Sequence, residues 1–499
     1  MSNPNPPTAP TAAPLWLLAL ATVGLAALAW FLHGQTTVVA AGSDSSGYLN
    51  AARLLARGEL SAPQRLPPEL GPDVPPFHFM PLGYGRGGHA GVIVPTYPLG
   101  LPLHFAAGGL ALGWRLGPLW VIVGGAVAGI LLCYVCGREF GISPPLAFAG
   151  AATLALSPLF LFSSIQPLSD TLAMTWCVGA VWLALRARRG AAAWAVACGA
   201  ALAVCVLVRP TNVLLLPCLV ILLGDWRRLL AAGLGGLPGA LALAWCNQRL
   251  YGNPFTTGYG NVLASLDSQW VLPTLLHIGL WTARLLPAGL LLLPLAALPL
   301  WRQRGRLLLA LAAWGAAFVA FYSFYDVTHE TWWCLRFILP ALPALVFAAL
   351  LGLDTLCARA KDAAPRWRLL AAGGLVVWSA AVYQAWVPRL GLLEIGRNES
   401  AYHEAGLWAR RNLPPNAVVA TLPASGALYY YTGFTVMRWD LMSPADFKRY
   451  AAILRAANRP VYAMLFNGEA RALEEHMPDK WERIETVAGI SFWRLAPAP

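Results

Sequence analysis

Residues 15–32 read LWLLALATVGLAALAWFL and contain no charged side chain. A helix of roughly 20 apolar residues is long enough to cross the hydrocarbon core of a bilayer. The chain of 499 residues is 58% hydrophobic and only 12% charged, whereas charged residues make up about a quarter of an ordinary soluble domain. Ten further apolar runs follow, at 118–136, 145–162, 171–186, 191–208, 211–223, 229–246, 285–300, 307–324, 337–353 and 369–387. The sequence therefore predicts a mainly α-helical, polytopic membrane protein with about 11 transmembrane helices.

The positive charges predict how these helices are oriented. Lys and Arg are concentrated in every second loop between the apolar runs, and such loops lie in the cytoplasm by the positive-inside rule. The basic loops contain Arg138; Arg186, Arg188 and Arg189; Arg227 and Arg228; Arg302, Arg304 and Arg306; and Arg359, Lys361, Arg366 and Arg368. The first loop (33–117) and the chain after 387 are then predicted to face outward. The net charge of +12 comes mostly from these basic loops, so we do not expect nucleic acid as a partner.

These patterns divide the chain into three predicted parts. Residues 1–14 are predicted to be a disordered cytoplasmic tail, 15–387 a transmembrane domain, and 388–499 a small extracytoplasmic α/β domain in which strands alternate with helices. The first loop is predicted to carry an amphipathic surface helix over 45–56, followed by an irregular loop over 61–91 that covers a cavity. Segment 92–113 is apolar enough to span, but prolines interrupt it and a span here would invert every later loop. We interpret it as re-entrant or lying on the surface.

Two acidic residues stand at predicted outer ends of apolar runs. Asp44 lies in Gly-Ser-Asp-Ser-Ser-Gly-Tyr-Leu (42–49), and Asp170 ends Ser-Ser-Ile-Gln-Pro-Leu-Ser-Asp (163–170). Either residue can be the N-cap of the helix that follows it. A carboxylate at the membrane surface can instead act as a general base toward an attacking hydroxyl or amine. We take Asp44 as the candidate base and Asp170 as a second acidic group in the same cavity.

Two arginines occupy loops that are otherwise nearly free of positive charge. Arg209 (Val-Arg-Pro-Thr-Asn) and Arg336 (Trp-Trp-Cys-Leu-Arg-Phe) lie at predicted outer helix ends. Arginine can extend there to lipid headgroups, or its planar donor fork can hold a phosphate. We take both as candidate ligands of a phosphate or diphosphate leaving group, with Arg86, Arg249 and Arg284 as weaker candidates.

Other polar and aromatic residues give less specific signals. Asp326, His329 and Glu330 cluster within 325–333, but no paired His motif supports a metal site. We therefore expect no metal and no cofactor, and we assign His329 and Glu330 to sugar or acceptor contacts. Tyr97 is a candidate for stacking on a sugar or polyprenyl chain, the alternative being an interfacial aromatic belt.

In their order along the chain, these motifs resemble bacterial membrane glycosyltransferases of the GT-C superfamily, which are related to protein O-mannosyltransferases and lipid A aminoarabinose transferases. The resemblance rests on SDSSGY (43–48), PTYPLGLP (95–102), QPLSD (166–170), RPTN (209–212) and WWCLRFILP (332–340), and it covers roughly 15–390. It implies transfer of a sugar, with inversion, from a polyprenyl-phosphate donor to an acceptor outside the cytoplasmic membrane of a bacterium, with Asp44 as base.

The acceptor implied by this resemblance can be a lipid, a glycan or a protein. The mannosyltransferases pair their first-loop Asp with Glu, whereas this chain has Ser45, which argues against a protein acceptor. The Trp-Trp-Asp-Tyr-Gly of oligosaccharyltransferases is also missing, because Cys334 and Leu335 follow the two tryptophans. The alternatives are a transporter or lipid flippase, and a membrane scaffold that presents 388–499. A transporter usually carries ionisable groups near the bilayer midplane, and these apolar runs are almost bare of them.

Overall fold

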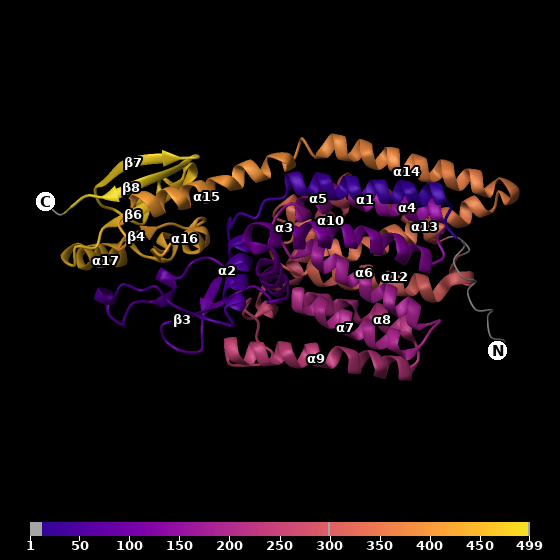
Figure 1. The fold of residues 1–499 in the computed structure, drawn as a ribbon, viewed down its shortest axis with the longest axis horizontal. Helices are drawn as coiled ribbons and strands as arrows, with labels where there is room; N and C mark the ends of the chain where they lie inside the picture. The colour runs from indigo at the N-terminus through magenta and orange to yellow at the C-terminus, as the bar shows by residue number, and fades with distance from the viewer. Residues whose placement is uncertain (1–11, 298–299, 498–499) are drawn as a thin grey trace.

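The computed structural model describes residues 12–297 and 300–497. A long helical body occupies most of the molecule, and a smaller unit containing a β-sheet lies at the end opposite the N-terminus (Figure 1). Helices make up 69% of the residues, so the prediction of a mainly α-helical chain is confirmed. The predicted tail 1–14 lies outside the described residues except for its last three positions.

The helices of the body run mostly along the long axis of the molecule (Figure 1). Their bounds are α1 Leu15–Gln35, α3 Gly100–Glu139, α4 Pro144–Ala155, α5 Pro158–Ser164, α6 Asp170–Ala187, α7 Ala192–Val208, α8 Leu216–Leu223, α9 Trp226–Tyr251, α10 Val271–Leu285, α11 Pro287–Leu291, α12 Leu300–Ser323, α13 Leu342–Ala358 and α14 Ala364–Trp386. Short 3₁₀ helices precede α8 and α13, at η3 Pro210–Leu215 and η7 Trp332–Ala341.

Several of these helices are apolar enough to cross a membrane. Among the described residues, six helices meet that requirement, or eight if each of two sharply bent pairs counts as one span. The predicted count of about 11 spans is therefore not confirmed for the described residues. Part of the difference is that 192–208 and 210–223 are short apolar helices.

The predicted span 285–300 is wrong as a single helix. Helix α10 begins at Val271, well before it, and the chain then bends by 114° into the helix that starts at Pro287. Proline is favoured at the first position of a helix because its missing N–H has no partner to lose there. Helix α10 was not predicted as an apolar run because it also carries polar residues, among them His277 and Arg284.

Segment 92–113 does not form a span of its own. Residues Val92–Pro95 form strand β3, and the first part of α3 begins at Gly100. At Gly113 the backbone leaves the helical conformation, with φ of 79°. A Cβ placed on Gly117 would overlap the backbone of Gly108, so the chain folds back on itself at this point.

The outer part of the first loop is built on helix α2 (Asp44–Ala56) and a small antiparallel sheet. Its strands are β1 Ala62–Pro63, β2 Tyr84–Arg86 and β3, in the order β1-β3-β2. Within α2, Gly47 approaches the backbone of Gly83 closely, since a Cβ on Gly47 would lie 3.0 Å from the Gly83 Cα and would overlap the ring of Tyr97. Glycine at 47 therefore allows Tyr97 to lie against the start of α2.

The C-terminal unit contains a five-stranded mixed sheet in the order β5-β4-β6-β8-β7. Strand β4 runs parallel to β5 and β6, and β8 is antiparallel to both β6 and β7. The elements are α15 Ile395–Asn412, β4 Val418–Ala420, α16 Ser425–Tyr431, β5 Thr435–Met437, α17 Pro444–Ala456, β6 Val461–Phe466, α18 Ala472–Glu475, β7 Trp481–Val487 and β8 Ile490–Leu495. The predicted helix over 469–477 is shortened to α18.

The first loop supplies part of the core of this sheet. Leu70, Val74 and Phe79 are buried in one cluster with Phe447 of α17 and Val418 of β4. The predicted irregular loop over 61–91 therefore packs on the sheet, and does not simply cover a cavity. The first loop and the C-terminal unit share one hydrophobic core although more than 300 residues separate them in the sequence.

Helix α16 joins this unit to α2. The Arg53 guanidinium lies 3.5 Å from the ring centroid of Tyr430 and donates to the Tyr430 carbonyl, and Asn50 donates to the carbonyl of Gly426. The Ala40 N–H donates to the Tyr431 hydroxyl just before α2 begins. Since α2 begins at Asp44, the C-terminal unit supports the helix that carries this carboxylate.

We expect Gly426→Ala to loosen this contact. The added Cβ would overlap the Ser46 hydroxyl and lie 2.7 Å from the Ser46 Cβ, and such overpacking costs about 1–3 kcal/mol. The thermal midpoint of the full chain in detergent should fall, and Ser46→Ala in the same chain should recover part of the loss. The control is Gly433→Ala, where the added Cβ meets nothing within 4 Å. Equal midpoints for the two alanine variants would contradict the described packing.

Candidate active site

A polar cavity of about 330 Å³ lies at the end of the helical body next to α2. Its wall is contributed by the start of α2, the residue Tyr97, the start of α6, the α7–η3 junction, the loop before α10, the end of α12 and η7. Five of the seven predicted site residues line it, namely Asp44, Tyr97, Asp170, Arg209 and Arg336. Segments scattered over nearly 300 positions of the sequence therefore meet here.

Asp44 is the first residue of α2, and its carboxylate points to side chains of other elements. The Tyr97 hydroxyl donates to Oδ1 at 2.6 Å, and Arg336 Nη2 donates to Oδ2 at 2.6 Å. The cap position is Ser43, whose side chain makes no capping hydrogen bond and instead lies 2.7 Å from the Tyr97 hydroxyl. The carboxylate is thus engaged with the cavity wall on both oxygens.

Arg336 connects the two acidic residues. Its Nη1 lies 3.8 Å from the Asp170 carboxylate, while Nη2 binds Asp44. Asp170 is 2% exposed and also forms an ion pair with Arg209. Two carboxylates and two guanidiniums therefore form one contiguous network at the cavity wall.

One donor in this network has no partner. The Nε–H of Arg336 is buried and makes no hydrogen bond within the described structure. A buried N–H without an acceptor is unfavourable by about 1–3 kcal/mol, and it would be satisfied by an anionic oxygen in the cavity.

The surroundings of Asp44 decide its charge. Burial alone raises the pKa of its carboxyl, but Arg336, the Tyr97 hydroxyl and Arg209 together hold that pKa below its usual value. Burial and the adjacent Asp44 raise the pKa of Tyr97, so its hydroxyl remains a donor at neutral pH. Asp44 is therefore ionised and oriented by Tyr97.

The cavity is also lined by tyrosines that the sequence analysis did not identify as site residues. Tyr48 donates to the Ser169 hydroxyl at 2.9 Å, next to Asp170, and Tyr322 contacts the Thr211 hydroxyl at 2.8 Å. Tyr48 stands one helical turn after Asp44, a spacing that places both on one face of α2. Tyr259 comes from an irregular loop, and no local sequence pattern marks it as a cavity residue.

Two predicted site residues lie outside the set that lines the cavity. The His329 ring stacks on Trp270 with centroids 4.9 Å apart, and Glu330 is exposed. Their assignment to sugar or acceptor contacts stays a prediction. Arg249 and Arg284 lie over the rings of Trp245 and Trp281. In the part of the chain described, no group of three or more His, Cys, Asp or Glu side chains is arranged to hold a metal ion.

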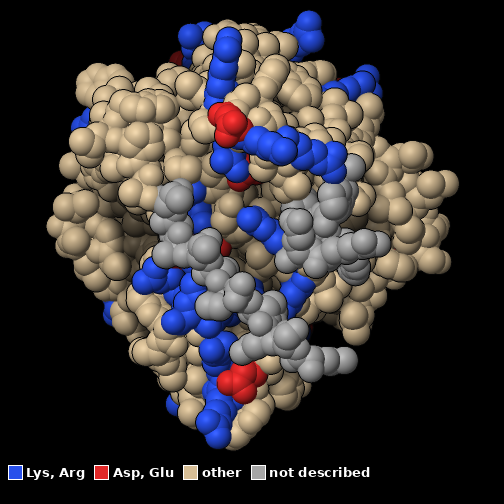
Figure 2. Space-filling view, turned by 90° about the vertical axis from the view of Figure 1, so that its right-hand side faces the viewer, with Lys and Arg blue, Asp and Glu red and all other residues tan. Residues whose placement is uncertain are grey.

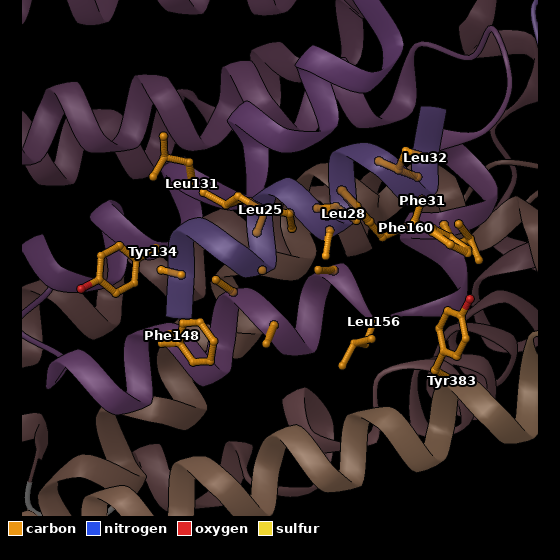
Figure 3. Close-up of a pocket in the computed structure, with 18 residues that line it drawn as sticks. Leu25, Leu28, Phe31, Leu32, Leu131, Tyr134, Phe148, Leu156, Phe160 and Tyr383 are labelled. Carbon is orange, nitrogen blue, oxygen red and sulfur yellow. The ribbon is translucent and has the colours of Figure 1, made fainter. Parts of the chain in front are cut away.

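A second cavity, of about 390 Å³, is almost entirely apolar. It runs between α1, α3, α4, α5 and α14, with Leu25, Leu28 and Phe148 pointing into it and Tyr134 and Tyr383 near its two ends (Figure 3). No charged side chain lines it. It can accommodate a hydrocarbon chain, but it offers no group for acid–base chemistry.

The architecture matches that of known membrane transferases. ArnT from Cupriavidus metallidurans, solved with undecaprenyl phosphate, superposes with a TM-score of 0.62 at 16% identity, over 98% of this chain and 100% of that one. The Archaeoglobus fulgidus oligosaccharyltransferase superposes with a TM-score of 0.54 at 14% identity, over 92% of this chain and 71% of that one. The mycobacterial arabinofuranosyltransferase AftD superposes with a TM-score of 0.58 at 14% identity, over 98% of this chain and 42% of that one.

All three structures are GT-C superfamily members, and the chain described here has their fold. No family profile and no curated protein sequence matches it. At 14–16% identity the similarity concerns the fold.

Proposed function

We propose that this chain is an inverting glycosyltransferase that moves a sugar from a polyprenyl-phosphate donor to a lipid, glycan or protein acceptor. The observation that supports it most is the contact between Asp44 and Arg336 in a polar cavity of a GT-C fold. One residue is suited to accept a proton and the other to hold a phosphate. Archaeal AglB of the same fold has been solved with a dolichol-phosphate, a ligand of the class proposed here.

The donor phosphate binds to Arg336, with Arg209 as the second candidate ligand. The unpartnered Nε–H of Arg336 offers a first contact, and a guanidinium can form two parallel hydrogen bonds to phosphate oxygens. Arg336 Nη2 donates to the Asp44 carboxylate. Binding of the phosphate therefore competes with Asp44 for Arg336 and weakens that ion pair.

This exchange prepares Asp44 for its role as base. Once Arg336 binds phosphate, the carboxylate loses its strongest charge partner and its proton affinity rises. The acceptor hydroxyl attacks the anomeric carbon, its proton passes to Asp44, and the bond from carbon to the phosphate oxygen breaks. The polyprenyl phosphate leaves with its charge held by arginine, which makes a metal ion unnecessary.

Asp170 and Tyr97 have supporting roles in this proposal. Asp170 is nearly fully buried and holds Arg209 and Arg336 on one side of the cavity. Tyr97 fixes the direction of the Asp44 carboxylate through its hydrogen bond to Oδ1. The apolar cavity in Figure 3 is the candidate location for a hydrocarbon chain of a lipid substrate.

The direct test is transfer from a synthetic polyprenyl-phosphate sugar by the purified full chain in nanodiscs. We expect release of polyprenyl phosphate that depends on Asp44, together with a product whose anomeric configuration is inverted, and no loss of activity with a chelator. Recovery of chelator-treated enzyme only after a divalent metal is added would contradict the metal-free mechanism. Movement of intact donor across the bilayer, without bond cleavage, would favour a flippase instead.

The proposed site faces the periplasm or cell exterior of a bacterial cytoplasmic (inner) membrane, as does the C-terminal unit. Alkaline phosphatase fused after residue 499 should therefore be active, and a fusion after Arg304 should be inactive because that loop is predicted to be cytoplasmic. A fusion after Lys361 serves as a second inactive control. An active fusion at Arg304 would invert the topology and place Asp44 in the cytoplasm.

A further inference from the structure

The end of the helical body opposite the sheet carries a concentrated positive charge. Figure 2 views this end, and Lys and Arg side chains gather across it with few acidic ones. Most of these arginines belong to the loops that the sequence predicts to be cytoplasmic. Some of their charges are neutralised, since Arg186 and Arg189 pair with Glu139 and Arg368 pairs with Asp354.

Three arginines on this end come together from different junctions of the chain. Arg188 follows α6, Arg228 is in the first turn of α9, and Arg306 is on α12. Arg228 Nη2 donates to the Arg188 carbonyl at 3.3 Å, and Arg306 Nε donates to the Ile221 carbonyl at 2.7 Å. We call these three residues the arginine cluster.

A glycine makes room for the cluster. Gly224 ends α8 in the left-handed conformation, with φ of 57°. A Cβ at this position would overlap the Arg306 guanidinium, which therefore fills the space beside the turn. The turn thus brings the charge of α12 toward the α8–α9 junction.

None of the three pairs with a carboxylate in the described part of the chain. The acid closest in sequence, Asp225, uses its side chain to cap α9 by accepting from the Arg227 N–H. Burial and the neighbouring positive charges of Arg306, Arg189 and Arg228 lower the pKa of Arg188. Uncompensated like charges repel each other, and a bound anion would relieve that repulsion.

The apolar surroundings indicate which anion fits. Trp226 is 67% exposed and Leu230 is 56% exposed on the same part of α9. A tryptophan of this kind is typical of the headgroup level of a bilayer, and exposed leucine on a membrane helix contacts acyl chains. A free phosphate would use the arginines only, whereas a phospholipid would use both surfaces.

We propose that Arg188, Arg228 and Arg306 bind the phosphate of an anionic phospholipid in the leaflet at this end of the protein. The site is separate from the polar cavity and does not depend on the proposed glycosyl transfer. Basic pockets between membrane helices are known to select anionic headgroups in this way. The bound lipid would fasten the α6–α7, α8–α9 and α12 junctions to one another.

Native mass spectrometry of the full chain tests this with phosphatidylglycerol as probe and phosphatidylcholine as reference. We expect one phosphatidylglycerol to be retained more tightly than the reference. The combined Arg188→Gln, Arg228→Gln and Arg306→Gln variant should bind it about tenfold more weakly or worse, because charge-assisted hydrogen bonds are lost. The matched control removes three exposed basic residues of the predicted cytoplasmic loops, as Arg359→Gln, Lys361→Gln and Arg366→Gln, and should retain the lipid.

Equal loss in the two triple variants would show general charge attraction and overturn the site. Displacement of the lipid by millimolar inorganic phosphate would overturn the lipid assignment in favour of a free-anion site. If the cluster variant is not monodisperse, Arg306→Gln alone is used, since its side chain is exposed. A single variant that binds phosphatidylglycerol as tightly as the unmodified chain would then contradict the proposal.

Discussion

Asp44→Asn is expected to reduce the rate of sugar transfer by about 10²–10⁴-fold, the range that a general base contributes. Donor affinity should stay the same or increase, because Arg336 Nη2 no longer has a carboxylate to satisfy. A lower rate with tighter donor binding is a combination that loss of folding does not produce. Transfer rate and donor affinity are measured on the same nanodisc preparation.

The control for this variant is Asp73→Asn. Asp73 also lies in the first loop, but it is exposed and is not among the residues that line the cavity, so its replacement should leave the rate unchanged. If Asp44→Asn keeps more than about a tenth of the activity, the base is another group. Asp44 would then serve only to hold Arg336 in place.

Arg336→Lys is expected to weaken donor binding by roughly tenfold or more, since lysine lacks the planar donor fork that can bind two phosphate oxygens. Arg336 is a harder position to replace than a lipid-facing arginine, because it bridges Asp44 and Asp170 inside the cavity. The measurement is the dissociation constant for a polyprenyl-phosphate sugar. A thermal melt of the same sample reports whether the ion-pair network has survived.

Arg389→Lys is the matched control for Arg336→Lys. Arg389 lies over the ring of Trp386 and does not line the cavity, so lysine there should leave donor affinity unchanged. Arg209→Lys is expected to weaken binding in the same direction as Arg336→Lys. Unchanged affinity in both Arg209→Lys and Arg336→Lys would rule out the proposed phosphate site and direct attention to Arg86, Arg249 and Arg284.

The gathering of Asp44, Arg209 and Arg336 was predictable because the pattern of apolar runs and basic loops assigns their helix ends to one predicted side of the membrane. Local sequence also explains why Tyr48 lies in the cavity wall, because it stands four residues after Asp44 on the same helix. Tyr259 could not be predicted, because it reaches the cavity from an irregular loop whose path depends on packing.

The errors in the predicted fold have physical causes of the same kind. Hydropathy detects continuous apolar runs, so it missed α10, in which polar residues such as His277 and Arg284 interrupt the pattern. The predicted run 285–300 therefore begins only at the 114° bend before Pro287, and the first helix of the bent pair lies outside it. The burial of Phe79 beside Phe447 depends on a contact between distant segments, which no local periodicity encodes.

The contact between α16 and α2 has a consequence for how the protein is made. Asp44 leaves the ribosome long before Gly426 and Tyr430, which contact its helix. During synthesis the N-terminal helices therefore exist without that brace. These contacts with α2 form only after α16 has been made, so a chain terminated before α16 would carry Asp44 on a helix without this support.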